Sequence, residues 1–221
     1  MAETLATVFR VAALAVATLV PLINPAGTAP IFLSLTSGVS DHARSIAAAR
    51  IARNTFLLLA GAMLGGSWIL LFFGLSLAEI RIAGGLLVVA TAWHLVRTEQ
   101  RPDAALVVLS QVESHDPIAH AVFYPLTFPV TIGPGSLSIA LAIGADAHGA
   151  PAAASLAGGV LGTAIVASIV YFCYRFAGHV ARMLGPAGTL VLLRLSAFIL
   201  LSVGVKILCD GLVERFGTGS A

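Results

Sequence analysis

Two short stretches of this sequence combine residues that interrupt a helix with residues that can bind a small polar solute. Proline removes a backbone donor and breaks a helix, and a helix that restarts behind it presents free N–H groups and the positive end of its dipole. Nearby amides and hydroxyls can add further donors and acceptors. The residues that we expect to bind a solute are Asn24, Pro25, Gly27 and Thr28 in the first stretch, and Thr131, Gly133, Pro134, Gly135 and Ser136 in the second.

A purely structural interpretation of each stretch stays open. The interruption could be a kink that lets helices pack, with its hydroxyls bonded back to carbonyls of the preceding turn. Two matched stretches in one chain favour a functional cavity, because irregular backbone survives inside a membrane only where protein buries it or where it lines a cavity. Arg81 and Arg194, which lie near the starts of two later apolar segments, could have a gating or charge role or could snorkel to the membrane surface.

The composition indicates a membrane protein. Of the 221 residues, 58% are hydrophobic and 10% are charged, and the mean hydropathy is +0.99. A soluble domain carries about 25% charged residues. We therefore expect the lipid bilayer to be a partner of this chain, and the net charge of +2 gives no reason to expect nucleic acid.

Six apolar segments follow one another along the chain. About 20 residues cross the hydrocarbon core, so the segments predict an all-α membrane protein with six transmembrane helices. The first and fourth segments are too long for one straight span and contain the prolines, so we expect these two helices to be broken. The segments are Leu5–Thr36, Thr55–Phe73, Ile80–Val96, Ala119–Ala145, Ala152–Phe172 and Thr189–Cys209.

The order of features in the first half of the chain recurs in the second half. Each half has a broken segment, then a pair of small residues four apart (Gly61/Gly65 and Gly158/Gly162), then a third segment that opens with an arginine. These correspondences predict an internal duplication. Three spans is an odd number, so the second repeat should enter the membrane from the opposite side. Inverted repeats with interrupted segments are typical of secondary transporters.

The duplication defines the expected domain organisation. We expect a single transmembrane domain over residues 1–221, made of repeat one at about 1–97, a linker at about 98–118 and repeat two at about 119–215.

Basic residues predict the orientation. Near the loops that follow odd-numbered segments lie Arg44, Arg50, Arg53, Arg97, Arg101, Arg175, Arg182 and Arg194, whereas Arg10, Arg81, Lys206 and Arg215 lie on the other side. Cytoplasmic loops carry an excess of Lys and Arg. We therefore expect a multi-pass protein of the bacterial inner (plasma) membrane, with both termini on the periplasmic or extracellular side.

Signs of catalysis are missing from the sequence. All ten acidic residues fall in loops or at segment ends. No nucleophile–base pair, metal-ligand spacing or ATP-binding loop stands out, so we expect neither an enzyme nor a cofactor or bound metal. Cys173 and Cys209 have no metal or redox spacing and are expected to pack as small apolar residues.

The first stretch, Asn-Pro-Ala-Gly-Thr-Ala-Pro-Ile-Phe-Leu at residues 24–33, together with Gly-Pro-Gly at 133–135, resembles the MarC family of bacterial and archaeal membrane proteins. The resemblance covers nearly the whole chain and includes the basic stretch Asp41–Arg53 and the sequence Arg-Ile-Ala-Gly-Gly at 81–85. It implies a relation to LysE-type exporters. Some members of the family are described as transporters of small neutral amino acids.

We therefore expect a secondary transporter of small neutral amino acids, of the glycine, alanine and serine class, that works by alternating access around a site between the two breaks. Because no acidic side chain is expected at that depth, a zwitterion is favoured over a cation. The alternatives are an exporter of another small solute or drug, and a non-transporting membrane scaffold. A coupling proton or sodium ion and a homo-oligomeric assembly stay open.

Overall fold

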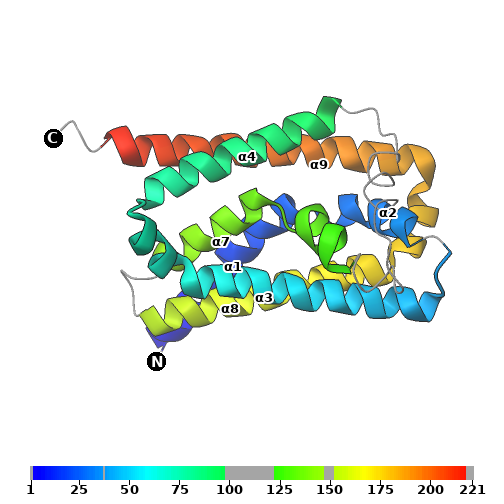
Figure 1. Ribbon diagram of the computed structural model, residues 1–221, viewed down its shortest axis with the longest axis horizontal. Coiled ribbons are helices and arrows are strands. Elements are labelled where there is room, and N and C mark those ends of the chain that lie inside the picture. The colour runs from blue at the N-terminus through cyan, green and yellow to red at the C-terminus, as the bar shows by residue number, and fades with distance from the viewer. Residues whose placement is uncertain (1, 37, 98–121, 147–151, 218–221) are drawn as a thin grey trace.

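The computed structural model describes residues 2–36, 38–97, 122–146 and 152–217. Regular structure in these ranges is helical throughout (Figure 1). The helices are α1 (Ala2–Ile23), α2 (Pro25–Leu35), α3 (Asp41–Phe73), α4 (Leu77–Arg97), the π-helical segment η1 (Val122–Thr131), α7 (Pro134–Asp146), α8 (Ala152–Arg175) and α9 (Ala177–Phe216).

The long helices form two layers with the short helices between them. In Figure 1, α4 and α9 run side by side along one edge, and α3 and α8 run along the other, with α1 packed on α8. The short segments α2, η1 and α7 lie in the middle of the view. These three short segments, which carry most of the two interrupted stretches, are therefore enclosed by the long helices.

Each interrupted stretch packs on helices from the other half of the chain. Helix α2 packs on α8 and α9, and helix α7 packs on α3 and α4. Helices with the same rank in the two halves also run in opposite directions in Figure 1, as the colour order along α3 and α8, and along α4 and α9, makes visible.

Glycines set the close approach of several helices. A Cβ placed on Gly85 of α4 would lie 2.6 Å from the Leu208 backbone nitrogen of α9, and one on Gly158 of α8 would lie 2.6 Å from the Val8 carbonyl oxygen of α1. Small residues allow this approach between membrane helices. Gly162 likewise packs against α1, so the predicted pair in the second half is a packing interface.

The matching pair in the first half, Gly61 and Gly65, does not form a packing interface. No heavy atom would lie within 4 Å of a Cβ on Gly61, and the Cβ of Gly65 would approach Ile69 of its own helix at 3.8 Å. Gly66 makes the close contact instead, because a Cβ there would lie 2.7 Å from the Leu141 carbonyl oxygen of α7. The close contact of α3 with α7 therefore lies next to the Gly61/Gly65 pair and does not involve it.

Two helices extend well beyond their apolar segments. Helix α3 begins at Asp41 rather than near Thr55, because the Ser40 side chain accepts a hydrogen bond from the Ala43 N–H (3.2 Å) and an alanine-rich run follows. The basic stretch expected in a loop is therefore helical. Helix α9 likewise exceeds its expected bounds and is kinked at Gly185, whose φ is 62°.

Three helices are long and apolar enough to cross a membrane: Ala2–Ile23, the Asp41–Gly66 part of α3, and Ala152–Arg175. There are four if η1 and α7, which bend by 72°, count as one span. The breaks expected in the first and fourth segments are confirmed. Six crossings and the inverted repeat stay predictions, and the expected linker at 98–118 lies outside the described residues.

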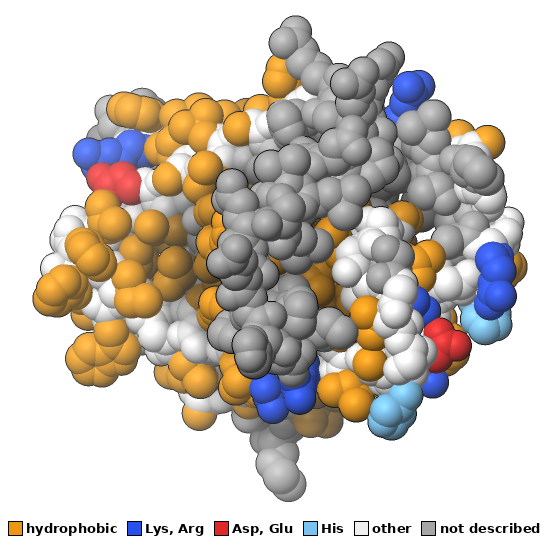
Figure 2. Space-filling model, turned by 45° about the vertical axis from the view of Figure 1, so that its right-hand side comes forward, with side chains coloured by type: hydrophobic (Ala, Val, Ile, Leu, Met, Phe, Trp, Pro, Cys, Tyr) orange, Lys and Arg blue, Asp and Glu red, His pale blue; other side chains and the backbone are white. Residues whose placement is uncertain are grey.

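The surface agrees with a membrane environment. Large apolar side chains such as Phe72, Trp68 and Leu71 are strongly exposed. Figure 2 shows hydrophobic side chains over much of the visible face, with histidines and several basic side chains toward its right-hand side. A lipid-facing exterior explains this pattern, since such an apolar surface would be unfavourable in water.

Candidate functional site

The first break is made by one residue, Asn24. Its φ and ψ are 48° and 56°, in the left-handed region that Asn tolerates better than most residues. Its N–H completes α1 by donating to the Val20 carbonyl (2.9 Å), and its own carbonyl accepts from the Thr28 N–H (3.0 Å) to begin α2. Pro25 then occupies the first helical position, where no N–H is needed. The interruption is therefore short and well bonded.

Few backbone groups at this break remain available to a ligand. The Gly27 N–H donates to Asn24 Oδ1 (3.2 Å), so the side chain caps its own helix. Pro25 has no N–H, so it cannot bond the Pro21 carbonyl one turn earlier. The Ala26 N–H has no hydrogen-bond partner among the described residues. One donor and one acceptor thus lie next to each other at the break.

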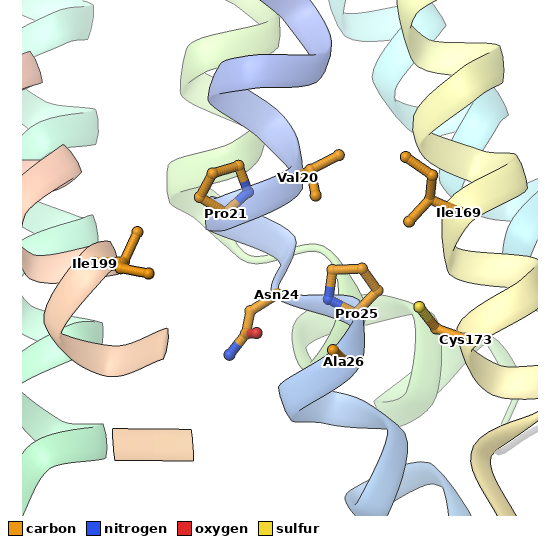
Figure 3. A pocket seen from close by; sticks show the side chains of 8 residues that line it. All are labelled: Val20, Pro21, Asn24, Pro25, Ala26, Ile169, Cys173 and Ile199. Carbon is orange, nitrogen blue, oxygen red and sulfur yellow. The ribbon is translucent and has the colours of Figure 1, made fainter. Parts of the chain in front are cut away.

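A cavity of about 270 Å³ adjoins these groups (Figure 3). It lies between α1, α2, α8 and α9, and the Asn24 amide is the one strongly polar side chain in its lining. Figure 3 shows this amide extending from the break into the space toward Ile199 of α9. The lining residues are Val20, Pro21, Asn24, Pro25, Ala26, Ile169, Cys173 and Ile199.

The second break has a different local structure. Within η1, Tyr124 and Phe128 have extended backbone angles, and both precede prolines in cis peptide bonds. The chain then restarts as α7 at Pro134, where the Gly133 carbonyl accepts from the Leu137 N–H (3.3 Å) and from the Ser136 hydroxyl (2.8 Å). The proline again occupies the first helical position, as in α2.

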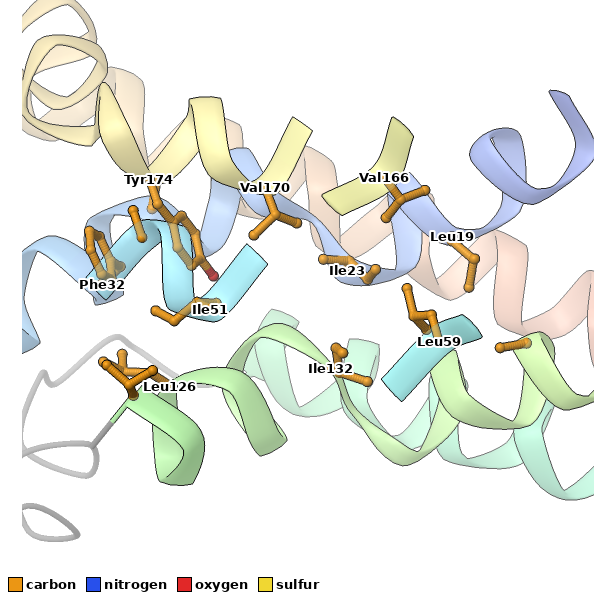
Figure 4. Packing of buried hydrophobic residues seen from close by; sticks show 14 of the residues in the cluster. Leu19, Ile23, Phe32, Ile51, Leu59, Leu126, Ile132, Val166, Val170 and Tyr174 are labelled. Carbon is orange, nitrogen blue, oxygen red and sulfur yellow. The ribbon is translucent and has the colours of Figure 1, made fainter. Parts of the chain in front are cut away.

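A buried tyrosine joins the two breaks. The Tyr174 hydroxyl of α8 donates to Thr28 Oγ1 (2.9 Å) and lies 2.7 Å from Thr131 Oγ1. The side chain is fully buried, and its ring stacks on Phe32 of α2 with centroids 4.6 Å apart. Figure 4 shows Tyr174 in the apolar cluster with Phe32 and Ile51. The three hydroxyls form a polar contact inside an otherwise apolar core.

The expected site residues are therefore divided between two places. Asn24 and Pro25 line the cavity, and Thr28 and Thr131 meet at Tyr174. Gly27 is buried against the Asn24 side chain. The remaining four residues form the start of α7 and do not line this cavity: Gly133, Pro134, Gly135 and Ser136.

The two arginines lie in different surroundings. Arg81 forms an ion pair with Glu214 of α9 (2.6 Å), which joins the start of α4 to the end of α9. Arg194 is exposed on α9. Neither lines the cavity at Asn24.

Tyr174 is the residue that the sequence interpretation missed. It lies near the end of an apolar segment, next to Cys173 and Arg175, where a tyrosine is ordinarily an interfacial anchor. No local pattern marks it as the partner of Thr28 and Thr131.

Comparisons with known proteins identify the family. The sequence profile of MarC family integral membrane proteins matches residues 9–216. Inner membrane protein MarC of Salmonella typhimurium is 27% identical over 215 residues, and that of Escherichia coli is 28% identical over 218, each alignment covering 95% of this chain and 97% of the relative. A membrane protein of Archaeoglobus fulgidus is 33% identical over 198 residues, or 90% of each chain. No solved structure matches. The chain is thus a member of the MarC family of integral membrane proteins.

Proposed function

We propose that this protein is a secondary transporter of small neutral amino acids, of the glycine, alanine and serine class. The observation that carries the proposal is the hydroxyl contact through which Tyr174 joins Thr28 at one broken helix to Thr131 at the other. It supplies a specific contact between the two interrupted stretches that alternating access would have to rearrange.

An inverted repeat is part of the proposal. The packing of each short helix on the other half of the chain supports it. Helix α2 packs on α8 and α9, and helix α7 packs on α3 and α4. The opposite directions of corresponding helices in Figure 1 support it as well. In transporters of this kind the substrate site lies where the two repeats meet, at discontinuous helices.

The groups around the cavity suit a small zwitterion. The Ala26 N–H and the Asn24 amide can donate to a carboxylate at the start of α2, where the helix dipole also favours negative charge. The Pro21 carbonyl can accept from an ammonium group. The lining contains no acidic side chain, so a second positive charge on the substrate would be buried without compensation.

Alternating access would act on the hydroxyl contact. In the conformation described, Tyr174 holds Thr28 and Thr131 together. A movement of one repeat against the other would separate them, and each threonine hydroxyl would keep an acceptor in its own segment, Asn24 O (3.2 Å) for Thr28 and Leu126 O (2.7 Å) for Thr131. The contact can therefore open without leaving an unsatisfied hydroxyl on either threonine.

Uptake by proteoliposomes tests the proposal. Purified protein should take up labelled alanine, and unlabelled glycine, alanine or serine should compete, whereas lysine and glutamate should not. Imposed proton and sodium gradients would identify a coupling ion. Strong competition by lysine would contradict the zwitterion site and favour transport of another solute. Absence of uptake for every amino acid, in protein that remains folded, would favour the scaffold.

A further inference from the structure

A second cavity, of about 480 Å³, lies where the ends of four helices meet. Its lining comes from α2, α3, the end of α8 and the start of α9, and includes Arg44, Arg175, Arg182 and His179. The one carboxylate in the lining is Asp41. In Figure 2, histidines and several basic side chains lie on the right-hand side of the view.

Arg44 neutralises that carboxylate and is committed to the fold. Its guanidinium pairs with Asp41 (2.8 Å), and it also donates to the Thr36 hydroxyl and to the carbonyls of Thr36 and Val39. These bonds fix the turn between α2 and α3. Arg44 therefore forms a wall of the pocket and has little capacity left for a ligand.

Arg175 and Arg182 are the cations that remain available. Arg182 donates from Nε to the Gly178 carbonyl (3.1 Å), which leaves both terminal nitrogens of its guanidinium. Arg175 lies 6.0 Å from the centre of the Phe176 ring. Within the part of the chain that the structure describes, neither arginine has an acidic partner. The pocket therefore has an excess of two positive charges.

The start of α9 adds donors to the same pocket. Phe176 precedes the helix and makes no side-chain cap, and Gly178 in the first turn lines the cavity. The first N–H groups of a helix lack partners within it and carry the positive end of the dipole. The His179 N–H already donates to the Phe176 carbonyl (2.9 Å), which leaves the N–H groups of Ala177 and Gly178 as donors. Together with two guanidinium groups, they form a site for a compact anion with several oxygen acceptors.

We infer that this pocket binds a phosphate-bearing anion. Guanidinium groups match phosphate oxygens in geometry as well as in charge. The cavity volume lies within the roughly 300–1,000 Å³ of small-ligand sites, which is enough for a phospholipid headgroup. Basic pockets between membrane helices are typical binding sites for acidic headgroups, and a soluble phosphate ester would present the same chemistry. The inference is independent of the proposed transport.

Thermal unfolding in detergent distinguishes the two sources. One series adds dioleoylphosphatidylglycerol to the full-length protein, with dioleoylphosphatidylcholine as the uncharged reference, and another adds glycerol 3-phosphate. The variants are Arg175→Gln and Arg182→Gln, singly and together. Arg50→Gln on α3 is the matched control. It also replaces an arginine by glutamine at an exposed position, and Arg50 does not line the pocket.

Phosphatidylglycerol should raise the unfolding temperature of the wild type and of Arg50→Gln. Each single pocket variant should need a lipid concentration about fivefold higher to reach half of the maximal rise in unfolding temperature. The double variant should lose most of this rise. Stabilisation by glycerol 3-phosphate alone, with the same dependence on the arginines, would identify a soluble anion as the ligand. Equal responses of Arg50→Gln and the double variant, or no stabilisation by either phosphate source, would overturn the inference. Cooperative unfolding in phosphatidylcholine confirms that each variant is folded.

Discussion

At the scale of single residues, substitution of Tyr174 is expected to have a clear effect on both stability and transport. Its hydroxyl is buried and bonds a threonine in each broken stretch. Tyr174→Phe removes this contact while keeping the ring that stacks on Phe32. We expect a stability loss of about 1 kcal/mol and a rise of up to about tenfold in the KM for uptake, because the conformation with the formed site loses population.

Tyr171→Phe is the control for this change. Tyr171 lies one turn earlier on α8, is only partly buried, and its hydroxyl makes no hydrogen bond to the described residues. Its uptake kinetics should match those of the wild type. If both variants transport alike, the hydroxyl contact has no part in the transport cycle.

The first break was predictable from sequence at this scale, and the tyrosine was not. Asn24 and Pro25 act on their own backbone, so residue type and spacing suffice to predict the interruption. Thr28 and Tyr174 are 146 positions apart. Their pairing depends on how α2 is placed against α8, and neither side chain carries a local mark of it.

At the scale of helices, the contact between α7 and α4 supplies a test. A Cβ on Gly135 would lie 2.5 Å from Val88 Cγ2, whereas one on Gly133, two positions earlier, meets no heavy atom within 4 Å. Gly135→Ala should therefore destabilise the protein by about 1–3 kcal/mol. Gly133→Ala should be nearly neutral. Thermal unfolding in detergent measures both.

A second substitution tests whether the clash with Val88 causes the destabilisation by Gly135→Ala. Val88→Ala creates space opposite position 135 at the cost of a buried side chain. The double variant should then be more stable than the sum of the two single effects, since residues in contact are coupled. If the effects of the two single variants on stability simply add, the destabilisation by Gly135→Ala does not come from its contact with Val88.

Helix bounds were less accessible to sequence interpretation than the breaks. Hydropathy marks the part of a helix that lipid or protein must cover, and α3 continues through the alanines and arginines at 41–53 because its cap at Ser40 lies outside the apolar segment. The glycine spacing in α3 also does not identify the residue that packs on α7, which is Gly66. Which glycine meets α7 depends on helix rotation, and a repeated spacing does not specify that rotation.

At the scale of the whole molecule, the orientation in the membrane is the expectation to measure. In a variant without native cysteines, His42→Cys at the start of α3 should be shielded from impermeant thiol reagents in intact cells. Leu75→Cys, between α3 and α4, should react. Both positions are exposed in the structure, so access depends on the side of the membrane. The opposite pattern would reverse the orientation inferred from the arginines.

The packing of α2 on helices of the second half also has a consequence for biogenesis. Helix α2 leaves the ribosome long before α8 and α9, on which it packs. The tyrosine partner of Thr28 is made 146 positions later, which takes roughly 7–29 s at about 5–20 residues per second. During that interval the first half sits in the bilayer with its interrupted helix unpaired. We therefore expect this helix to contact the insertion machinery or a membrane chaperone until α8 and α9 have been made.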